Sequence, residues 1–127
     1  MAGKLKMVIV MRTDLNMRKG KMIAQGAHAA TMPFLVEVVF PDGDLKRRDR
    51  LMQWISDSHM TKITLRVGSE EELLDIYNKA DDAGLDSYIV TDAGFTEFHG
   101  VPTKTCISIG PNLEDEIDLI TGQLKLL

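Results

Sequence analysis

Cysteine is nearly absent from this sequence of 127 residues, and prolines and long apolar runs are scarce. Cys106 is the only cysteine, so it cannot form an internal disulfide bond, which is compatible with a reducing cytosol. The longest unbroken apolar run near the start, Met7–Met11, is far short of the ~20 residues of a membrane span. It is also shorter than the ~7–15 apolar residues of a secretory leader. We therefore expect a soluble cytoplasmic protein with no membrane association.

The sequence also lacks internal repeats, linkers, low-complexity tracts and any Cys or His spacing typical of a metal site. Because one domain usually has ~100–200 residues, residues 1–127 are expected to form a single domain without a bound metal. A phosphate-binding loop of the nucleoside triphosphatases is excluded. Leu15 and Met22 stand where that motif requires a glycine and a Ser or Thr.

Charge is distributed unevenly along the chain, although the formal net charge is only −4. Residues 1–66 contain 12 Lys or Arg and 6 Asp or Glu, whereas residues 67–127 contain 3 and 13. A basic half can supply a local positive face for a polyanion even when the whole chain is acidic. Charge runs are more often solvated surface, so the asymmetry indicates a phosphate-rich partner only if other features agree.

Hydrophobic patterns predict elements in the order β-α-α-β-α-β-β-α. Strands are expected over 6–11, 61–67, 87–90 and 104–109, and helices around 23–34, 45–55, 69–84 and 112–122. Alternating strands and helices predict an α/β fold with a largely parallel sheet and helices on its faces. The link from 90 to 104 holds no helix, so the last two strands could be antiparallel and the sheet mixed.

Several residues are expected to set the limits of these elements. Pro33 should kink or end the first helix near its middle, because proline removes a backbone hydrogen bond. Ser69 and Glu72 match a capping box, and Gly84 is well placed to end that helix. Gly110–Pro111 should stop the last strand, and Asn112 should cap the last helix. In the first helix, one apolar face is expected to contain Ile23, Ala27, Ala30 and Phe34.

Two polar loops, 12–20 and 91–102, follow the predicted strands at 6–11 and 87–90. Ligands of open α/β sheets usually bind beyond the carboxyl ends of parallel strands. The first loop leads into a helix N-terminus that favours an anion. Lys21 at that position either extends into solvent or binds an anion, and Gln25 and His28 follow it along one polar face.

Asp92, directly after the third predicted strand, has two interpretations. It could be a turn aspartate that accepts a hydrogen bond from its own backbone beside Gly94. Alternatively, it could pair with Lys21, with Thr96 and Thr105 as neutral hydroxyl partners. Cys106 lies in an apolar strand, where an inert buried thiol is far more common than a nucleophile.

Short blocks spread over nearly the whole chain resemble the second type of peptidyl-tRNA hydrolase, which is common in archaea and eukaryotes. These blocks are Lys6–Val10, Arg12–Met17, Lys19–Lys21, Ala24–Gln25, His28–Ala29, Asp92–Gly94, Thr96, Thr105, Ile109–Pro111 and Ile120–Leu126. Their common order and spacing make the resemblance far more specific than any single block.

The resemblance implies hydrolysis of the ester between a peptide and the terminal ribose of tRNA. This reaction acts on N-blocked aminoacyl-tRNA, releases peptide and free tRNA, and recycles tRNA from stalled translation. The implied fold is a three-layer α/β/α arrangement around a four-stranded mixed sheet, expected here to be mostly parallel. A homodimer without metal or cofactor is also implied. The implied catalytic residues are Lys21, Asp92, Thr96 and Thr105, and other active-site motif positions, expected to bind substrate, are Arg12, Lys19, Gln25 and His28.

These residue types suit ester hydrolysis by water without a covalent intermediate. Lys21 could stabilise the developing oxyanion, and Asp92 could either act as a base, orient the water or hold Lys21. Thr96 and Thr105 could hydrogen-bond the water or the peptide carbonyl. The basic residues of the first half, including Lys46, Arg47, Arg48 and Arg50, are expected to contact tRNA phosphates.

The chain departs from the family pattern in one loop. Phe95 stands where the family often has a basic or polar residue, and the segment 97–102 is one residue longer than expected. Its aromatic ring could stack on the terminal adenine. Two other functions stay open from the sequence, namely a non-catalytic RNA-binding module on the same fold and a hydrolase of another acyl ester.

Overall fold

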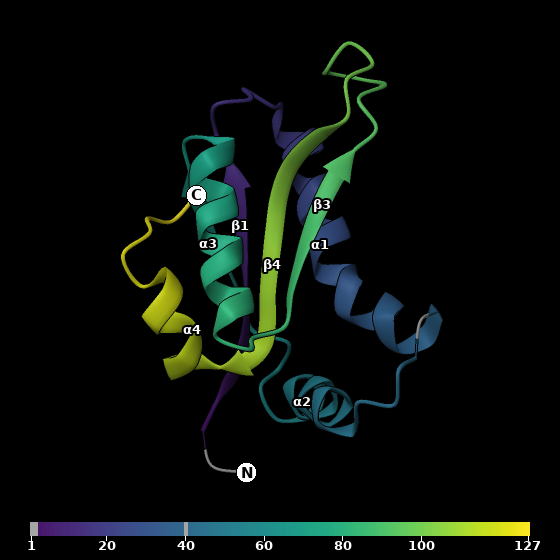
Figure 1. Cartoon of the computed structure of the whole chain (residues 1–127), viewed down its shortest axis with the longest axis vertical. Coiled ribbons are helices and arrows are strands. Elements are labelled where there is room, and N and C mark those ends of the chain that lie inside the picture. Colours follow the sequence, from purple (N-terminus) through teal and green to yellow (C-terminus); the bar gives the residue numbers. More distant parts are fainter. Residues whose placement is uncertain (1–2, 40) are drawn as a thin grey trace.

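The computed structural model describes residues 3–39 and 41–127 (Figure 1). Its elements follow the predicted order, which is confirmed. They are β1 (Leu5–Arg12), α1 (Lys19–Val39), α2 (Leu45–Ser56), β2 (Lys62–Val67), α3 (Glu70–Asp82), β3 (Ser87–Asp92), β4 (Thr103–Leu113) and α4 (Glu114–Thr121).

The four strands form one mixed sheet in the order β2-β1-β4-β3. Only β1 and β2 pair in parallel, because β4 runs antiparallel to both β1 and β3. The prediction of a mostly parallel sheet is therefore wrong, whereas the mixed sheet and the antiparallel last pair are confirmed. The physical reason is the helix-free link between β3 and β4. Since no crossover helix carries the chain back, β4 returns beside β3 and inserts next to β1.

This topology still brings the two polar loops together. Since β1 and β3 are both antiparallel to β4, they point in the same direction, and their carboxyl ends lie at the same edge of the sheet. Figure 1 shows the beginning of α1 and the β3–β4 loop at this end of the molecule. The end of β1 and the end of β3 are thus neighbours although 80 residues separate Arg12 from Asp92.

Helices cover both faces of the sheet, which confirms the three-layer arrangement (Figure 1). On one face, α3 and α4 pack through Leu73 and Ile117 against Val8 and Val10 of β1. On the other face, residues of α1 and α2 pack against Leu5, Met7, Ile9 and Met11 of the same strand. Successive β1 side chains point to opposite faces, so a strand buried on both sides must be continuously apolar.

Helix α1 continues through Pro33 for 21 residues. Of the two predicted effects of Pro33, a kink or the end of the helix, the second is therefore wrong. Proline has no N–H to donate to the carbonyl of Ala29, four residues earlier. The hydroxyl of Ser108 in β4 donates to that carbonyl instead, at 2.8 Å, and Ser108 is completely buried. The sheet therefore supplies the hydrogen bond that the helix lacks.

The side of α1 that packs on the sheet is not its most apolar side. Gln25, Ala29 and Pro33 are the buried residues of this helix, whereas Ile23 is 73% exposed. Of the expected apolar face, Ala30 and Phe34 pack against the core, whereas Ile23 and Ala27 are exposed. By length and composition alone, α1 is apolar enough to cross a membrane, with a mean hydropathy of 1.2 over 18 residues. The core helix of a soluble protein can pass the same test, and α1 forms one layer over the sheet.

Strand β4 also extends further than predicted, through Gly110 and Pro111 to Leu113. The side chain of Asn112 does not cap α4, which corrects that prediction. Its Oδ1 accepts a hydrogen bond from the backbone N–H of Asp86 at 3.2 Å, and α4 begins without a side-chain cap.

The other predicted helix limits hold in α3. The hydroxyl of Ser69 accepts from the backbone N–H of Glu72 at 3.0 Å, which confirms the capping box. Gly84 follows the end of α3 with a φ of 77°. This left-handed conformation is readily available to glycine, so the predicted stop has its expected physical cause.

Candidate active site

Lys21 and Asp92 meet at the edge where β1 and β3 end. The Lys21 ammonium donates to Oδ1 of Asp92 at 2.8 Å, and each side chain is 14% exposed. Lys21 lies in the first turn of α1, and Asp92 is the last residue of β3. Of the two interpretations of Lys21, the structure therefore favours a side chain held at an anionic group over one extended into solvent.

Both interpretations of Asp92 hold at once, because its two oxygens have different partners. Oδ2 accepts from the backbone N–H of Gly94 at 2.8 Å, as in an Asx turn, while Oδ1 accepts from Lys21. The hydrogen bond from Lys21 has the largest influence and lowers the pKa of the Asp92 carboxyl, as does Gly94, against the opposing effect of burial. Asp92 is therefore a carboxylate at neutral pH.

Thr96 is the third member of this group. Its Oγ1 accepts a second hydrogen bond from the Lys21 ammonium at 2.8 Å, and the residue is exposed. Because the hydroxyl accepts from Lys21, its own proton remains available for a water or a substrate oxygen. Within the described part of the chain, Asp92 and Thr96 are the hydrogen-bond partners of Lys21, which leaves one of its three N–H groups for a ligand.

Thr105 and Gln25 lie behind this group and do not face solvent. Thr105 is completely buried and Gln25 is 2% exposed. The Thr105 hydroxyl donates to Oε1 of Gln25 at 2.6 Å, and Nε2 of Gln25 donates to Oδ1 of Asp92 at 3.3 Å. Neither side chain is accessible to a substrate. Their hydrogen bonds connect them to the exposed group through Asp92.

Arg12, at the end of β1, is buried and hydrogen-bonded within the chain. Its guanidinium donates twice to Asp14, at 3.0 and 2.8 Å, and to the backbone carbonyl of Lys104 at 3.0 Å. It also lies 3.6 Å from Glu70, and its side chain is 10% exposed. The ion pair lowers the pKa of Asp14. Arg12 thus connects β1 with the start of β4 and of α3, and most of its donors are already used.

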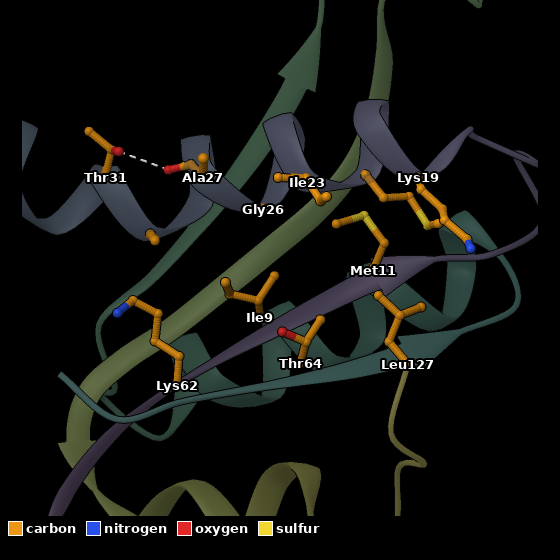
Figure 2. A pocket seen from close by; sticks show the side chains of 12 residues that line it. Ile9, Met11, Lys19, Ile23, Gly26, Ala27, Thr31, Lys62, Thr64 and Leu127 are labelled. Atoms are coloured by element: carbon orange, nitrogen blue, oxygen red, sulfur yellow. Dashed lines mark hydrogen bonds between the residues drawn. The ribbon is translucent and has the colours of Figure 1, made fainter. Parts of the chain in front are cut away.

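Lys19 and His28 are the remaining residues of the predicted set, and both are exposed. His28 lies near enough that its charge lowers the pKa of Asp92 slightly. Lys19 instead lines an apolar groove beside α1 (Figure 2). The structure therefore brings Lys21, Gln25, Asp92, Thr96 and Thr105 into one hydrogen-bonded network and places Lys19 apart from it.

Phe98 belongs to this site although no sequence pattern selected it. The Lys21 ammonium lies 5.5 Å from the centre of its ring, a cation–π contact. Phe98 is partly buried against the core, while Phe95 in the same loop is 89% exposed. Two phenylalanines three residues apart in an irregular loop carry no periodic signal, so only the folded loop distinguishes them.

Two of the four basic residues of α2 are already paired within the chain, which corrects part of the phosphate-contact prediction. Arg47 donates to Glu37 at 2.9 Å and twice to Asp42. Arg50 donates to both carboxylate oxygens of Asp86. Lys46 and Arg48 are exposed. Figure 1 shows α2 at the end of the molecule opposite the β3–β4 loop, so these cations are remote from Lys21.

An open apolar groove with a volume of about 720 Å³ lies between α1 and the β1–β2 side of the sheet. Figure 2 shows the side chains that line it. We call it the α1 groove; the residues that matter here are Ile9, Met11, Ile23, Ala27, Thr64 and Leu127. It forms because α1 lies mainly over β4 and β3 and leaves this face of β2 uncovered. Lys21, Asp92 and Thr96 do not line it.

In the described ranges 3–39 and 41–127, no three His, Cys, Asp or Glu residues are grouped so that they could hold a metal ion. Cys106 is completely buried, and burial raises the pKa of its thiol to about 11. The prediction of a buried cysteine is confirmed, and such a thiol is a poor nucleophile at neutral pH.

Comparison with known proteins gives one consistent result. A family model described as "Peptidyl-tRNA hydrolase PTH2" matches residues 5–127. A peptidyl-tRNA hydrolase of Methanocaldococcus jannaschii is 45% identical over 123 residues, covering 97% of this chain and all of that one. One from Sulfolobus acidocaldarius has the same identity and coverage. A probable peptidyl-tRNA hydrolase 2 of Dictyostelium discoideum is 37% identical over 98% of this chain and 55% of its own.

Proposed function

The chain belongs to the PTH2 family of peptidyl-tRNA hydrolases, and from this premise we propose how its site hydrolyses the substrate. The bond broken is the ester between the peptide and the terminal ribose of tRNA, and the products are free tRNA and peptide. The observation that carries the proposal is the Lys21–Asp92–Thr96 group at the shared edge of β1 and β3. We further propose that residues 1–127 act as one catalytic domain in the cytoplasm.

In the proposed mechanism, Lys21 stabilises the negative charge that develops on the carbonyl oxygen of the ester when water attacks. Its ammonium has a donor left for this oxygen, and its side chain is largely shielded from solvent, with only 14% exposed. An ammonium in a partly desolvated site interacts more strongly with an anion than one in water. Thr96 is placed to donate its hydroxyl proton to the carbonyl oxygen of the ester. The proton that the attacking water gives up passes to the ribose oxygen as the ester bond breaks.

We assign Asp92 to orientation rather than to proton abstraction. The neighbouring ammonium and the Gly94 N–H lower its pKa, and a carboxylate with a lowered pKa is a weaker base. Its negative charge keeps the Lys21 side chain at the site, and its oxygens can align a water that also touches Thr96. Of the roles that the sequence left open for Asp92, orientation is therefore the one we propose.

Thr105 and Gln25 hold Asp92 in this proposal and do not touch the substrate. A hydroxyl donor 2.6 Å from Oε1 forces the Gln25 amide to turn its Nε2 toward Asp92. The reverse orientation would place a carbonyl oxygen against a carboxylate. Both residues are thus positioning residues, in contrast to the substrate contact expected for Gln25 and the direct role expected for Thr105.

The test is the release of tRNA from N-acetyl-aminoacyl-tRNA and from free aminoacyl-tRNA by the purified protein. We expect release only from the blocked form, and a fall in kcat of about 100- to 1,000-fold for Lys21→Ala, as for loss of an oxyanion donor. Lys79→Ala, an exposed lysine of α3, is the matched control and should keep wild-type rates.

Two other results would reject the proposal. Binding of the blocked tRNA without release would support a non-catalytic RNA-binding module. Release from simple acyl esters but from neither tRNA would support a hydrolase of another substrate.

We also propose that the chain forms a homodimer through the α1 groove. Ile23, 73% exposed, projects beside the groove that it helps to line (Figure 2). An interface with two-fold symmetry needs a surface that is complementary to itself. An apolar side chain next to an apolar hollow meets this condition, because the axis can place Ile23 of each copy in the groove of the other.

Light scattering after gel filtration tests this arrangement. Ile23→Glu should convert the dimer to a monomer, since a carboxylate would be buried without a partner. Leu119→Glu is the control, because Leu119 is 85% exposed on α4, over the other face of the sheet. A wild-type monomer, or a dimer that survives Ile23→Glu, would exclude this interface.

A further inference from the structure

Phe95 is the most exposed large apolar side chain in the described part of the chain, at 89%. Isolated exposed apolar residues are common and need no special explanation. The position of this one is unusual, because it directly precedes Thr96, whose hydroxyl accepts from Lys21 at 2.8 Å. Since neighbouring Cα atoms are ~3.8 Å apart, the ring is tethered one residue away from the proposed catalytic group.

The loop that carries Phe95 is held by several hydrogen bonds. The N–H of Gly100 donates to the carbonyl of Gly94 at 2.7 Å, and the N–H of Val101 donates to the carbonyl of Phe98 at 3.0 Å. Gly94 is fixed in turn by its bond to Asp92. Phe98 anchors the loop against the core, so the fold presents the other ring, Phe95, to solvent beside the site.

We propose that the Phe95 ring is a stacking surface for the base at the 3′ end of the tRNA. This inference rests on the proposed function. The scissile ester is carried by the ribose that also carries the terminal adenine. The base must therefore lie within one nucleotide of Lys21 and Thr96 when the ester reacts. A flat base face stacks on an exposed aromatic ring irrespective of the surrounding sequence.

A cation beside the loop favours a nucleotide over an apolar peptide side chain at this position. The Arg18 side chain is 92% exposed, and its Nε lies 4.0 Å from Oε1 of Glu97 in the same loop. A contact at this distance and exposure is weak, so the guanidinium remains available for the phosphate that precedes the terminal nucleoside. The peptide side chain also differs between substrates, whereas the terminal base is the same in all of them.

Kinetics on a short acylated RNA provide the first test. The substrate is a CCA trinucleotide carrying an N-acetylated amino acid ester, together with its counterpart whose terminal nucleotide lacks the base. For the intact substrate, we expect Phe95→Leu to raise KM about 5- to 150-fold, the range for one lost base stack, with kcat nearly unchanged. Phe95→Tyr should retain the wild-type KM. Val101→Ala, at a 60% exposed position in the same loop, is the control and should also retain it.

The abasic substrate identifies which part of the substrate meets the ring. If the base stacks on Phe95, its removal raises KM for the wild type and has no further effect on Phe95→Leu. The inference is wrong if removal of the base and Phe95→Leu raise KM by independent factors that multiply. It is also wrong if the rise in KM of Phe95→Leu depends on which amino acid is esterified, because Phe95 then contacts the peptide. An unchanged KM in Phe95→Leu would also reject it.

A binding measurement separates this inference from the proposed function. An uncharged CCA trinucleotide with 2-aminopurine as its last base cannot be hydrolysed, and its fluorescence is quenched when the base stacks. We expect quenching by the wild type and by Lys21→Ala, and none by Phe95→Leu. Quenching without any ester hydrolysis would support base stacking on Phe95 and reject the proposed hydrolase function. Ester hydrolysis with equal quenching by wild type and Phe95→Leu would support the hydrolase function and reject stacking on Phe95.

Discussion

The chemistry of the proposed site depends on how the two oxygens of Asp92 are shared. One oxygen accepts from the Gly94 backbone and the other from Lys21 and Gln25. A carboxylate with three donors is strongly held in its ionised form. This environment fixes the position of the lysine and makes Asp92 a weak base. The proposed mechanism therefore assigns the stabilisation of the transition state to the ammonium.

Replacing Lys21 by methionine should raise the pKa of Asp92. The hydrogen bond from Lys21 is the largest influence that lowers it, and burial, which raises it, would remain. In the wild type the folded pKa lies below the unfolded one, so the stabilisation by this pair is present at neutral pH. It is lost only as the pH falls through the lowered pKa. In Lys21→Met this stabilisation is absent and the folded pKa is higher, so acidification should remove less stability through Asp92.

A carbon-detected NMR titration of the Asp92 carboxyl in both proteins measures this shift directly. The control is Asp42, whose pKa is lowered by its hydrogen bond from Arg47 beside α2 and should be the same in both proteins. An Asp92 pKa that is unchanged by Lys21→Met would contradict the pairing.

Thr105→Val should lower kcat about 10- to 100-fold with little change in KM, the size expected when a catalytic group is misplaced. Valine has nearly the same shape but cannot donate to Gln25, whose amide is then free to turn its oxygen toward Asp92. Thr105→Ser retains the hydroxyl and should restore the rate. Rates are measured well below the unfolding midpoint of each variant. A loss of stability alone, with kcat intact, would show that Thr105 only fills the core.

At the scale of elements, α1 shows how the sheet compensates for a local defect in a helix. Pro33 leaves the carbonyl of Ala29 without its helical donor, and Ser108 of β4 supplies one. The backbone carbonyl of Gln25 also accepts a hydrogen bond from β4, donated by the thiol of Cys106 at 3.4 Å. These contacts fix the rotation of α1 on the sheet. The same rotation directs Gln25 toward Asp92 and leaves Ile23 exposed.

Ser108→Ala should reduce the free energy of unfolding by about 1–3 kcal/mol, because it leaves a buried carbonyl unpaired. In that background, Pro33→Ala should recover much of the loss, since an alanine in place of the proline restores the N–H that the carbonyl of Ala29 lacks. Urea unfolding of the wild type, both single variants and the double variant measures the coupling. Strictly additive effects would show that Ser108 does not replace the missing helical hydrogen bond.

Over the whole molecule, two groups of exposed or partly exposed basic residues lie far apart. Arg18 and Lys21 lie at the proposed active site, whereas Lys46 and Arg48 lie on α2, which follows the far end of α1. A helix of 21 residues is ~30 Å long, so the second group is about this far from the ester. In the proposed complex, the tRNA phosphates near this second group belong to the body of the tRNA rather than to its 3′ end.

Salt dependence with two substrates tests this separation. For N-acetyl-aminoacyl-tRNA, kcat/KM should fall steeply as the salt concentration rises. In a plot of log kcat/KM against log salt concentration, the double variant Lys46→Ala, Arg48→Ala should have a slope that is shallower by up to about two. With the acylated CCA trinucleotide, which spans only ~10 Å when stacked, the same variant should behave as wild type. Arg47→Ala should leave both slopes unchanged, because Arg47 is paired with Glu37 and Asp42. If all variants had the same slope with the tRNA substrate, the tRNA phosphates would not contact Lys46 and Arg48.

The order and type of the elements, the capping of α3 and the approach of the two polar loops were predictable from the sequence. The element types and the cap depend on residues close together in the chain, such as the apolar run of β1 and the bond from Glu72 N–H to Ser69. The loops meet because β1 and β3 point in the same direction. The strand directions were harder to predict, because the place of β4 between β1 and β3 is a choice among distant pairings. The passage of α1 through Pro33 depends on a serine 75 residues away.

The family, the element order and the identities of the polar residues at the edge of the sheet could all be read from the amino-acid order. Which of these residues face solvent became known only from the folded chain. It buries Thr105 and Gln25, pairs Arg12, Arg47 and Arg50 within the chain, and exposes Phe95. The reason is physical: residue type sets what a side chain can donate, accept or bury. Its partner and its access to water depend on the packing of segments that are remote in the sequence.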